Sequence, residues 1–578
     1  MKVKKINAAT IFSATFFLLN VAHAEEVNTA NISREAARQA AGENEFQPTE
    51  KVEVEEIDDD GSDVENVIEE TFVLKGIKID SDIDEIGYEE VQHIIEPYID
   101  QEVNINALKR LALQIKDYCR QKGWLASVAY LPEQDSTDGT VTIKIMSPNF
   151  GKVTFNNQSR LASDILEKVG RNITDKQMVQ NHKIENVLYL INEIGGVRAR
   201  GALIPDTLTR TVGLNVNVVN DQTRRGILYY ENYGNKNTGR YRLGTIYDIY
   251  NIDNRGSRLE FSGLISKGSD LDNYVVDYSW ITDRKTTSRA GISFGRTTYH
   301  QVPNKQADEI FDLNIDAGGH STDFRLYGIT PVWKTIHDGF VWNYGYKFRN
   351  YTQSVNYRQN IDLTSFGLGK YQYDGHSQGK NYIHTFSVGV SGYKRSLFND
   401  LFNYAFTVYG GNVSPRSVDA EQQALVGDTK GKYFRSVLNL DYRKLFNKYI
   451  EFHTNFTWQA AIRNLVGAEQ LTVGGANGVR GYADGDGSGD EGYLSKSEII
   501  WHTGEPGLSL SVFFDIGGTG TKSENNIQTI RSWGLEANYT KPNDYFIKLD
   551  WARRIGINPL VATDNKKHRF WFMVGKIF

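Results

Sequence analysis

The segment GGANGVRGYADGDGSGDEGY, residues 474–493, places one arginine, Arg480, among eight glycines and four acidic residues. Glycine admits positive φ and close approach of the backbone to a neighbour, at a cost in conformational entropy. An arginine in such a segment can pair bidentately with a carboxylate, which gives the contact direction as well as energy. The segment therefore predicts a loop that carries a polar contact and that other elements must position.

The same loop has some features of a calcium site. Asp484, Asp486 and Ser488 match the start of the EF-hand pattern, but Ser495 stands where the bidentate glutamate is needed. No helix pair is expected around it. A mobile acidic loop is the interpretation that we favour.

A second motif could carry hydrolytic chemistry. GHSQG, residues 375–379, matches the G-x-S-x-G pattern around Ser377, which works only between a strand and a helix of an α/β sheet. Here it lies in a Gly- and Tyr-rich stretch between strand-like segments, which we expect to be a loop, so we interpret it as a chance match. The eleven histidines show no H-E-x-x-H spacing. We expect no enzyme activity, no metal and no cofactor.

Composition narrows the class of protein. The 578 residues include 12% aromatics, 53 glycines and a single cysteine, Cys119. One cysteine excludes an internal disulfide framework. A net charge of −6 without a basic domain argues against nucleic-acid binding.

The first 24 residues have the pattern of an export signal. Lys2, Lys4 and Lys5 precede an apolar run, residues 8–21, and Ala-His-Ala follows at 22–24 as a cleavage site. The run is shorter than the ~20 residues of a membrane-spanning helix. No later stretch approaches such a helix, so a location in a membrane would require a closed β-barrel.

Two unlike segments follow the predicted signal peptide. Residues 25–42 contain NISREAARQAA, an alanine-rich helix that Asn31 or Ser33 can cap. Residues 43–70 contain thirteen acidic residues and one lysine. Such a self-repelling stretch predicts an extended, disordered linker.

Residues 71–148 and 149–221 repeat one order of elements, β-α-α-β-β. In the first module the longer helix carries an apolar stripe that ends with Cys119, which we expect to fill the core. In the second module the longer helix is predicted over residues 175–194. Each unit has the size of a small domain.

From residue 222 to 578, strict alternation replaces helical periodicity. The apolar face carries tyrosine and tryptophan and the other face carries charges, as in a barrel with lipid outside and water inside. The apolar sets are Tyr274, Val276, Tyr278 and Trp280; Phe311, Leu313, Ile315 and Ala317; Ile450, Phe452, Phe456, Trp458 and Ala460; and Trp533, Leu535, Ala537 and Tyr539. We expect these faces to meet lipid. At roughly 22 residues per strand, this part gives about 16 antiparallel strands.

The end of the chain, FWFMVGKIF, places Phe570, Phe572, Val574 and Phe578 on one face. A terminal aromatic after such alternation resembles the C-terminal signal of bacterial outer-membrane barrels. Lys576 interrupts the row, and it could reach water at the rim of the membrane.

The strand LSLSVFFDIGG, residues 508–518, supplies a partner for Arg480. Its alternation directs Phe513, Asp515 and Gly517 into the lumen. Because this strand lies one strand beyond the loop, we expect Arg480 to fold inward and pair with Asp515. In a water-filled lumen such a pair would contribute only about 1 kcal/mol.

These motifs together resemble the TpsB transporters of two-partner secretion, which belong to the Omp85 superfamily. The resemblance rests on VRGY in an inward loop (Val479 to Tyr482), F-x-D-x-G on the next strand, two preceding POTRA-like modules and a tethered helix. It covers the whole mature chain. The long acidic tether is similar to that of the CdiB branch, which exports contact-dependent inhibition toxins.

The resemblance implies roles for particular residues. The N-terminal helix, with Asn31, Ser33, Arg34, Glu35 and Arg38, would plug the pore, although its position alone supports this and a mobile N-terminus stays open. Arg480 and Asp515 would form an inner latch. Val479, Gly481, Tyr482, Phe513 and Gly517 would support it.

The resemblance also implies partners and a location. The chain would lie in outer-membrane lipid as a monomer inserted by the barrel assembly machinery, with its POTRA modules in the periplasm. These modules would capture the N-terminal secretion domain of a large exoprotein by strand addition, without nucleotide hydrolysis. An insertase of the same superfamily is disfavoured because such relatives carry more POTRA modules. A passive porin needs neither these modules nor a plug.

Overall fold

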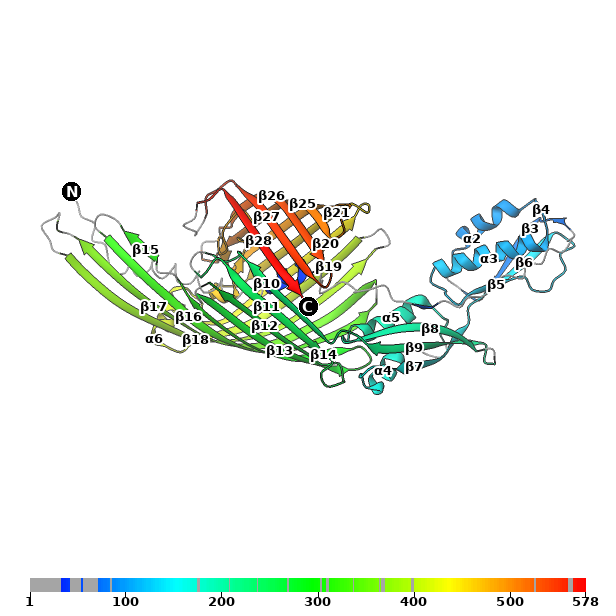
Figure 1. Cartoon of the computed structure of the whole chain (residues 1–578), viewed down its shortest axis with the longest axis horizontal. Helices are drawn as coiled ribbons and strands as arrows, with labels where there is room; N and C mark the ends of the chain where they lie inside the picture. Colours follow the sequence, from blue (N-terminus) through cyan, green and yellow to red (C-terminus); the bar gives the residue numbers. More distant parts are fainter. Residues whose placement is uncertain are drawn as a thin grey trace.

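The computed structural model describes residues 33–41, 54–55, 71–83, 86–173, 177–206, 208–235, 238–267, 270–301, 304–307, 311–335, 337–362, 364, 370–396, 400–523, 526–559 and 565–578. The predicted signal peptide, Asn31 and most of the predicted linker lie outside these residues. Within them, the chain forms two small α+β modules that extend from one end of a large barrel (Figure 1).

The first module has the predicted order of elements. It consists of β2 (Phe72–Val73), β3 (Gly76–Ser81), α2 (Tyr88–Ile95), the 3₁₀ helix η1 (Glu96–Tyr98), β4 (Glu102–Val103), α3 (Ile105–Gln121), β5 (Val128–Tyr130) and β6 (Thr140–Met146). Helix α3 begins where the Asn104 side chain accepts a hydrogen bond from the Ala107 amide, at 2.9 Å. Its apolar stripe is buried against the sheet and includes Cys119. Burial raises the pKa of the Cys119 thiol, as suits a residue that fills the core.

The second module has a longer sheet. It consists of β7 (Asn149–Asn157), α4 (Ser163–Gly170), α5 (Asn181–Asn192), β8 (Val197–Asp206) and β9 (Thr211–Asn220). The predicted helix over residues 175–194 is too long at its start. The amide of Phe150 donates to the carbonyl of Gln177, and the amide of Val179 donates to that of Pro148. These contacts tie residues 177–179 to strand β7, which keeps them out of the helix.

The prediction of a structureless linker is wrong at two residues. β1 (Val54–Glu55) pairs in parallel with Gly201 and Ala202 of β8, so the sheet order is β1-β8-β9-β7. Valine alternates with glutamate around this point, a pattern that favours a strand even in an acidic segment. The edge of β8 therefore accepts an added strand.

The remaining strands close into a barrel. They are β10 (Arg224–Glu231), β11 (Arg242–Tyr250), β12 (Arg258–Ser266), β13 (Leu271–Asp283), β14 (Ser288–His300), β15 (Asn304–Ala307), β16 (Phe311–Lys334), β17 (Asp338–Asp362), β18 (Lys370–Arg395), β19 (Asp400–Pro415), β20 (Gly431–Leu445), β21 (Ile450–Ala461), β24 (Glu491–His502), β25 (Leu508–Gly520), β26 (Gln528–Lys541), β27 (Tyr545–Ile555) and β28 (His568–Ile577). The short β15 pairs with β16 beyond the end of β14, so the described residues form sixteen barrel strands. The predicted number is confirmed.

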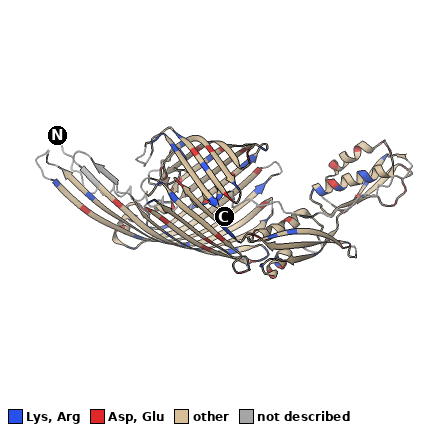
Figure 2. Cartoon of the chain, viewed as in Figure 1, with Lys and Arg blue, Asp and Glu red and all other residues tan. Residues whose placement is uncertain are grey.

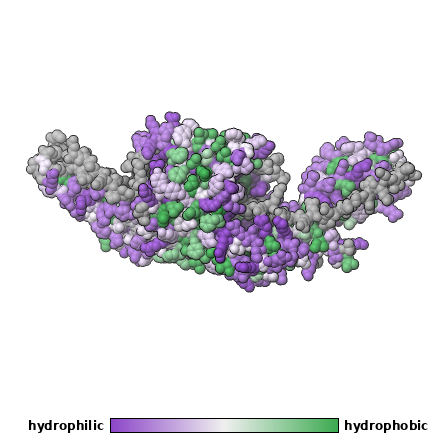
Figure 3. All heavy atoms as spheres, viewed as in Figure 1, coloured by the Kyte–Doolittle hydropathy of each residue, from purple (hydrophilic) through white to green (hydrophobic). Residues whose placement is uncertain are grey.

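The two faces of the wall differ in polarity. Lipid-facing side chains such as Tyr274, Phe514 and Leu535 are exposed, whereas their neighbours Asp515 and Ser532 are buried in the lumen. Figure 3 shows hydrophobic residues gathered over the outer wall of the barrel. At the C-terminal end, Lys576 forms an ion pair with Asp544 in the turn before β27.

One predicted face is wrong. Ile315 and Ala317 share the inward face of β16 with Asp323, which pairs with Arg349 across the lumen wall at 2.6 Å. Ala317 is buried against Val355 of β17. Alternation alone could not reveal this, because this part of β16 extends beyond the lipid-facing band.

The second module contacts the turns at its end of the barrel. Arg289 donates to the carbonyl of Ile194 at 3.1 Å, and the amide of Ala162 donates to the carbonyl of Asn254 at 2.8 Å. Ion pairs join Arg284 with Asp164 and Lys334 with Glu193, further tying the module to the barrel.

The barrel closes between its first and last strands over a short stretch. The ladder of β10 with β28 runs from Ile227 to Glu231, and backbone hydrogen bonds of Gly226 with Phe578 and of Asn232 with Phe572 extend it at its two ends. By contrast, β17 pairs with β18 along its full length. No helix in the described part of the chain has both the length and the apolar character needed to cross a membrane.

Candidate functional site

The segment between β21 and β24 folds back into the barrel. It contains the 3₁₀ helix η3 (Gly467–Glu469) and a small hairpin of β22 (Leu471–Thr472) and β23 (Ser488–Gly489). Val473, Val479 and Tyr482 from this loop pack with Leu494 and Ile530 of the wall in a buried apolar cluster. The glycine-rich segment is therefore held as a packed lid, and its last residues, from 491, already belong to β24.

Arg480 is the centre of a buried ionic cluster. Its guanidinium contacts carboxylates from four successive strands: Glu498 on β24 at 2.7 Å, Asp515 on β25 at 2.9 Å, Glu536 on β26 at 3.0 Å and Asp550 on β27 at 3.1 Å. The Arg480 side chain is 2% exposed and that of Asp515 is not exposed at all.

The contact with Asp515 is the most complete of the four. Both Nε and Nη2 of Arg480 donate to it at 2.9 Å, and the Arg480 amide adds a third bond at 3.1 Å. The predicted pair is thus present, but the expectation of a weak, water-exposed contact is wrong. A buried, bidentate ion pair is much harder to break than a solvated one.

Two motif glycines allow this approach. A Cβ atom on Gly481 would lie 2.7 Å from Cβ of Ser532, and one on Gly517 would lie 2.9 Å from Cβ of Val473. Real Cβ atoms do not come so close, so larger residues at either position would push the loop off the wall. The glycines of VRGY and F-x-D-x-G are explained by this packing.

Aromatic residues complete the cluster. The guanidinium of Arg480 lies over the ring of Phe513, 3.3 Å from its centroid. The indole of Trp571 on β28 donates to the Arg480 carbonyl at 2.8 Å. The hydroxyl of Tyr482 donates to the carbonyl of Ile557 at 2.9 Å. Figure 2 shows acidic and basic segments interleaved along these strands.

A helix at residues 33–40 lies inside the barrel against β10 to β12. Ser33 donates to Glu231 at 3.1 Å, Arg34 to Glu260 at 3.2 Å, and Arg38 to Asp248 at 2.9 Å and Glu260 at 3.0 Å. Glu35 is exposed. The predicted plug residues within the described range thus lie in the lumen, and three of them bind its wall.

The alanine face of this helix covers the closure of the barrel. Ala37, Ala40 and Ala41 share a buried cluster with Ile227 of β10, Met573 of β28 and other residues of these strands. Thr540 of β26 donates to the carbonyl of Ala40 at 2.9 Å. The helix therefore spans the junction of first and last strands.

The helix and the loop belong to one assembly. Ala476 of the loop joins the same buried cluster as the helix alanines. Arg242 of β11 donates to Asp484 of the loop at 3.2 Å, and it lies 3.9 Å from Glu231, the acceptor of Ser33. Displacement of either element would expose part of the other.

A second anchor of the loop was not predicted. Glu469 accepts from Lys347 at 3.0 Å and from Arg435 at 2.7 Å, and it lies 3.9 Å from Arg349. The three cations face the lumen on β17 and β20. In the sequence they are ordinary charges of an alternating strand, so only the pairing register reveals that they converge.

The remaining motifs have structural roles. Asp490 accepts from the Leu465 amide at 2.8 Å and the Lys522 amide at 2.9 Å, so this acidic residue fixes the loop. The GHSQG motif lies within β18 and not in a loop. Its setting lacks the strand–turn–helix of a nucleophile elbow.

Comparisons with known proteins agree with this architecture. A family model described as POTRA domain, ShlB-type, matches residues 72–147, and one described as haemolysin secretion/activation protein ShlB/FhaC/HecB matches residues 384–539. The heme/hemopexin transporter protein HuxB of Haemophilus influenzae (strain 86-028NP) is 24% identical over 526 residues, which are 88% of this chain and 87% of that protein. The outer membrane transporter CdiB of Dickeya dadantii (strain 3937) is 19% identical over 426 residues, or 72% and 70%.

Solved structures share the fold. CdiB from Escherichia coli aligns with a TM-score of 0.61 at 16% identity, covering 94% of this chain and 96% of that one. CdiB from Acinetobacter baumannii aligns with a TM-score of 0.57 at 15% identity, covering 97% and 99%.

A closed barrel with periplasmic POTRA modules and an inward arginine loop defines an outer-membrane protein of the Omp85 type. Within that class the two family models, in this order along the chain, and the relatives named above make the chain similar to the TpsB transporters of two-partner secretion.

Proposed function

We propose that the chain exports one large exoprotein of the haemagglutinin/haemolysin or contact-dependent inhibition toxin type, without nucleotide hydrolysis and without catalysis of its own. The observation that carries the proposal is the double closure of the lumen. The helix at residues 33–40 and the loop around Arg480 meet at Ala476 inside one closed barrel. A passive pore has no use for two such obstructions, whereas an exporter of long chains must seal the membrane between substrates.

The Arg480–Asp515 contact acts as a latch in this proposal. Arg480 holds the loop against β24 to β27, and its release would let the loop swing toward the cell surface. Burial of both side chains supports a two-state element, because a half-open arginine would leave uncompensated carboxylates in the lumen.

The N-terminal helix acts as the plug. Arg34 and Arg38 bind Glu260 and Asp248 within a lumen that also contains other charges. The contact surface on the alanine side is small, because these side chains end at Cβ. The side chains of Arg34 and Arg38 keep 26% and 16% of their surface exposed, so water can replace them on the wall, which favours a plug that leaves when substrate arrives.

The POTRA modules capture the partner by strand addition. The edge of β8 already accepts Val54 and Glu55 from the linker, which supports its competence for main-chain pairing. An unfolded secretion domain could take the same edge. Folding of the exoprotein outside the cell would then supply the bias for export.

Further partners follow from the location. The barrel would be inserted by the barrel assembly machinery, act as a monomer in outer-membrane lipid and bind no nucleic acid. One relative is named for heme/hemopexin transport and others are CdiB transporters. We propose that the exported protein belongs to the exoprotein class that these two branches share.

An insertase for other barrels is the second candidate. The short pairing of β10 with β28 favours it, because an openable junction would suit lateral insertion. The two functions predict different effects of gene deletion. Loss of an exporter leaves one large protein in the periplasm while other barrels assemble normally; general loss of barrels from the outer membrane would instead support the insertase.

Deletion of residues 25–42 tests whether the N-terminal helix closes the pore. Under the proposal, this variant conducts more ions than the intact chain in a planar bilayer, with equal barrel abundance. Unchanged conductance would remove the plug.

A further inference from the structure

Three neighbouring strands extend far beyond the rest of the barrel. The outward face of β17 carries Phe340, Trp342, Tyr344, Tyr346 and Phe348, and then changes to Asn350, Thr352, Ser354, Asn356, Arg358 and Asn360. Because the aromatic part meets lipid, the membrane ends near Asn350. At about 3.3 Å per residue, residues 350–362 continue for roughly 40 Å outside it. Figure 1 shows β16 to β18 projecting away from the POTRA end.

The two edges of this extension are treated differently. On the β16 side, β14 pairs as far as Gly318 and β15 covers Asp312 to Ile315. On the β18 side, β19 pairs only as far as Asn381. Among the described residues, no strand pairs with residues 371–377 on that side, which leaves one open edge outside the cell.

A helix covers the foot of this edge. Ser417 caps α6 (Val418–Val426) and also accepts from the Lys380 amide at 3.0 Å, while Asp419 accepts from the Gln378 amide at 2.7 Å. Ser417 donates back to the carbonyl of Gln378 at 3.0 Å. These bonds show that main-chain groups of even-numbered residues point away from β17. Further along β18, the corresponding groups belong to Gln372, Asp374 and His376.

The open edge is regular. Asp374 binds Arg358 at 2.8 Å and His376 binds Asn356 at 2.7 Å, so cross-strand pairs hold it to β17. No bulge interrupts its pairing with β17 and residues 370–380 contain no proline. At Gly375 the ring of Tyr357 from β17 lies where a Cβ atom would be, so a larger residue would have to displace that ring. Proteins normally protect such an edge with a bulge, a proline or a cover.

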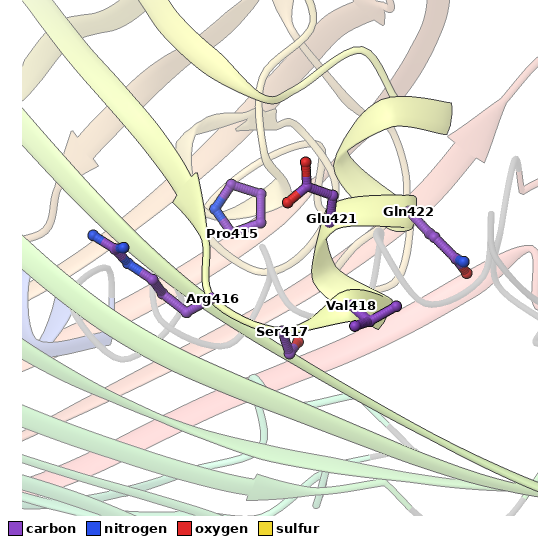
Figure 4. Close-up of a pocket in the computed structure, with 6 residues that line it drawn as sticks. All are labelled: Pro415, Arg416, Ser417, Val418, Glu421 and Gln422. Carbon is purple, nitrogen blue, oxygen red and sulfur yellow. The ribbon is translucent and has the colours of Figure 1, made fainter.

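A surface cavity lies where the cover ends. It has a volume of about 690 Å³ and is lined by Pro415, Arg416, Ser417, Val418, Glu421 and Gln422 (Figure 4). Arg416 donates its amide to the carbonyl of Lys380 at 2.7 Å, so the cavity adjoins the covered part of β18. A chain paired along the edge would reach it with a side chain.

We propose that residues 371–377 of β18 receive an extended segment of the exported protein by strand addition as it leaves the barrel. This inference rests on the proposed export function and assigns that function an exit site. The edge lies beyond the membrane boundary on the outer side of the barrel, and its main-chain groups match any extended backbone with little sequence demand. The first strand formed there would resist backward movement.

A second copy of this chain fits the edge less well. Two copies in one membrane share an outward direction, so their β18 strands would meet in parallel. Parallel pairing is slightly less stable per residue than antiparallel pairing. An emerging chain is free to adopt the antiparallel direction.

Two substitutions at His376 distinguish the role of the edge-facing amide from the role of the side chain. His376→Pro removes an edge-facing amide while the amides that face β17 remain. His376→Ala removes the same side chain and its bond to Asn356 but keeps the amide. The assay measures surface display of the exoprotein whose display is lost when this chain is deleted. We expect at least a threefold slower appearance for His376→Pro and wild-type kinetics for His376→Ala, with equal barrel abundance and conductance.

Photo-crosslinking gives an independent test in the folded full-length protein. A benzophenone amino acid at His376 should crosslink the exoprotein during export, and one at Thr352, in the central strand, should not. Crosslinks only to a second copy of this chain, or equal kinetics of both His376 variants, would overturn the exit site. Failure of the intact chain to display any exoprotein would overturn the export function itself.

Discussion

Replacing Arg480 with alanine removes a cation that touches four carboxylates of the inner wall. Asp515 and Asp550 are fully buried. Two cations of the wall would remain: Lys548, which binds Glu536 at 3.0 Å, and Lys496, which lies opposite Asp515 on β24. Two positive charges would then face four carboxylates, so the variant would leave a cluster with excess negative charge.

The cost can be estimated from the burial. Breaking a buried ion pair by removal of one partner costs about 3–5 kcal/mol. At 1.4 kcal/mol per tenfold change, the ratio of docked to undocked loop falls by roughly two to three and a half orders of magnitude. A solvated pair worth about 1 kcal/mol would change the same ratio only about fivefold.

Thiol labelling measures this ratio. With Cys119→Ser as background, Ala476→Cys places one thiol in the buried cluster between loop and helix. A membrane-impermeant maleimide should label it at least a hundredfold faster after Arg480→Ala. Arg463→Ala is the matched control, because Arg463 precedes the lid and pairs with the largely exposed Asp428. Acceleration below tenfold for Arg480→Ala, or equal acceleration for both variants, would refute the buried latch.

Three further perturbations have defined outcomes. Arg38→Glu places a like charge against Asp248 and Glu260, so it should raise single-channel conductance severalfold. Gln39→Glu, on the exposed side of the helix, should leave the conductance unchanged. Equal conductance of the two variants would contradict the plug. Trp571→Phe keeps an aromatic ring but loses the bond to the Arg480 carbonyl, so it should destabilise the docked loop by about 1–2 kcal/mol and speed labelling at residue 476 roughly tenfold; an unchanged rate would count against that bond. Leu111→Ala in the core of the first module should lower its stability by about 2–5 kcal/mol and open that module to limited proteolysis, with the barrel band intact on heating gels; wild-type resistance would be the contrary result.

The sequence predicted correctly those features that depend on the alternation within a single strand. The alternation around Asp515 placed it in the lumen, because lipid and water select opposite faces of the same strand. It failed where two strands decide together. Glu498, Glu536 and Asp550 converge on Arg480 through the register of β24 to β27, which no single strand encodes.

The other errors have physical causes as well. Ile315 was expected to face lipid because alternation distinguishes two faces without saying where the membrane stops. The Arg480–Asp515 pair was expected to be exposed to water, because the sequence does not show how tightly a glycine-rich loop packs on Gly517. Val54 joins a sheet because a neighbouring module offers an edge, a fact of tertiary structure.

The contacts of Arg480 also set an order of steps in the assembly of the barrel. Its partners come from β24, β25, β26 and β27, and Trp571 of β28 binds its carbonyl. Five consecutive strands must already stand in register before this arginine finds a complete nest. The loop can therefore dock only after the C-terminal strands of the barrel have paired. A barrel with a misaligned terminal strand would keep its loop undocked.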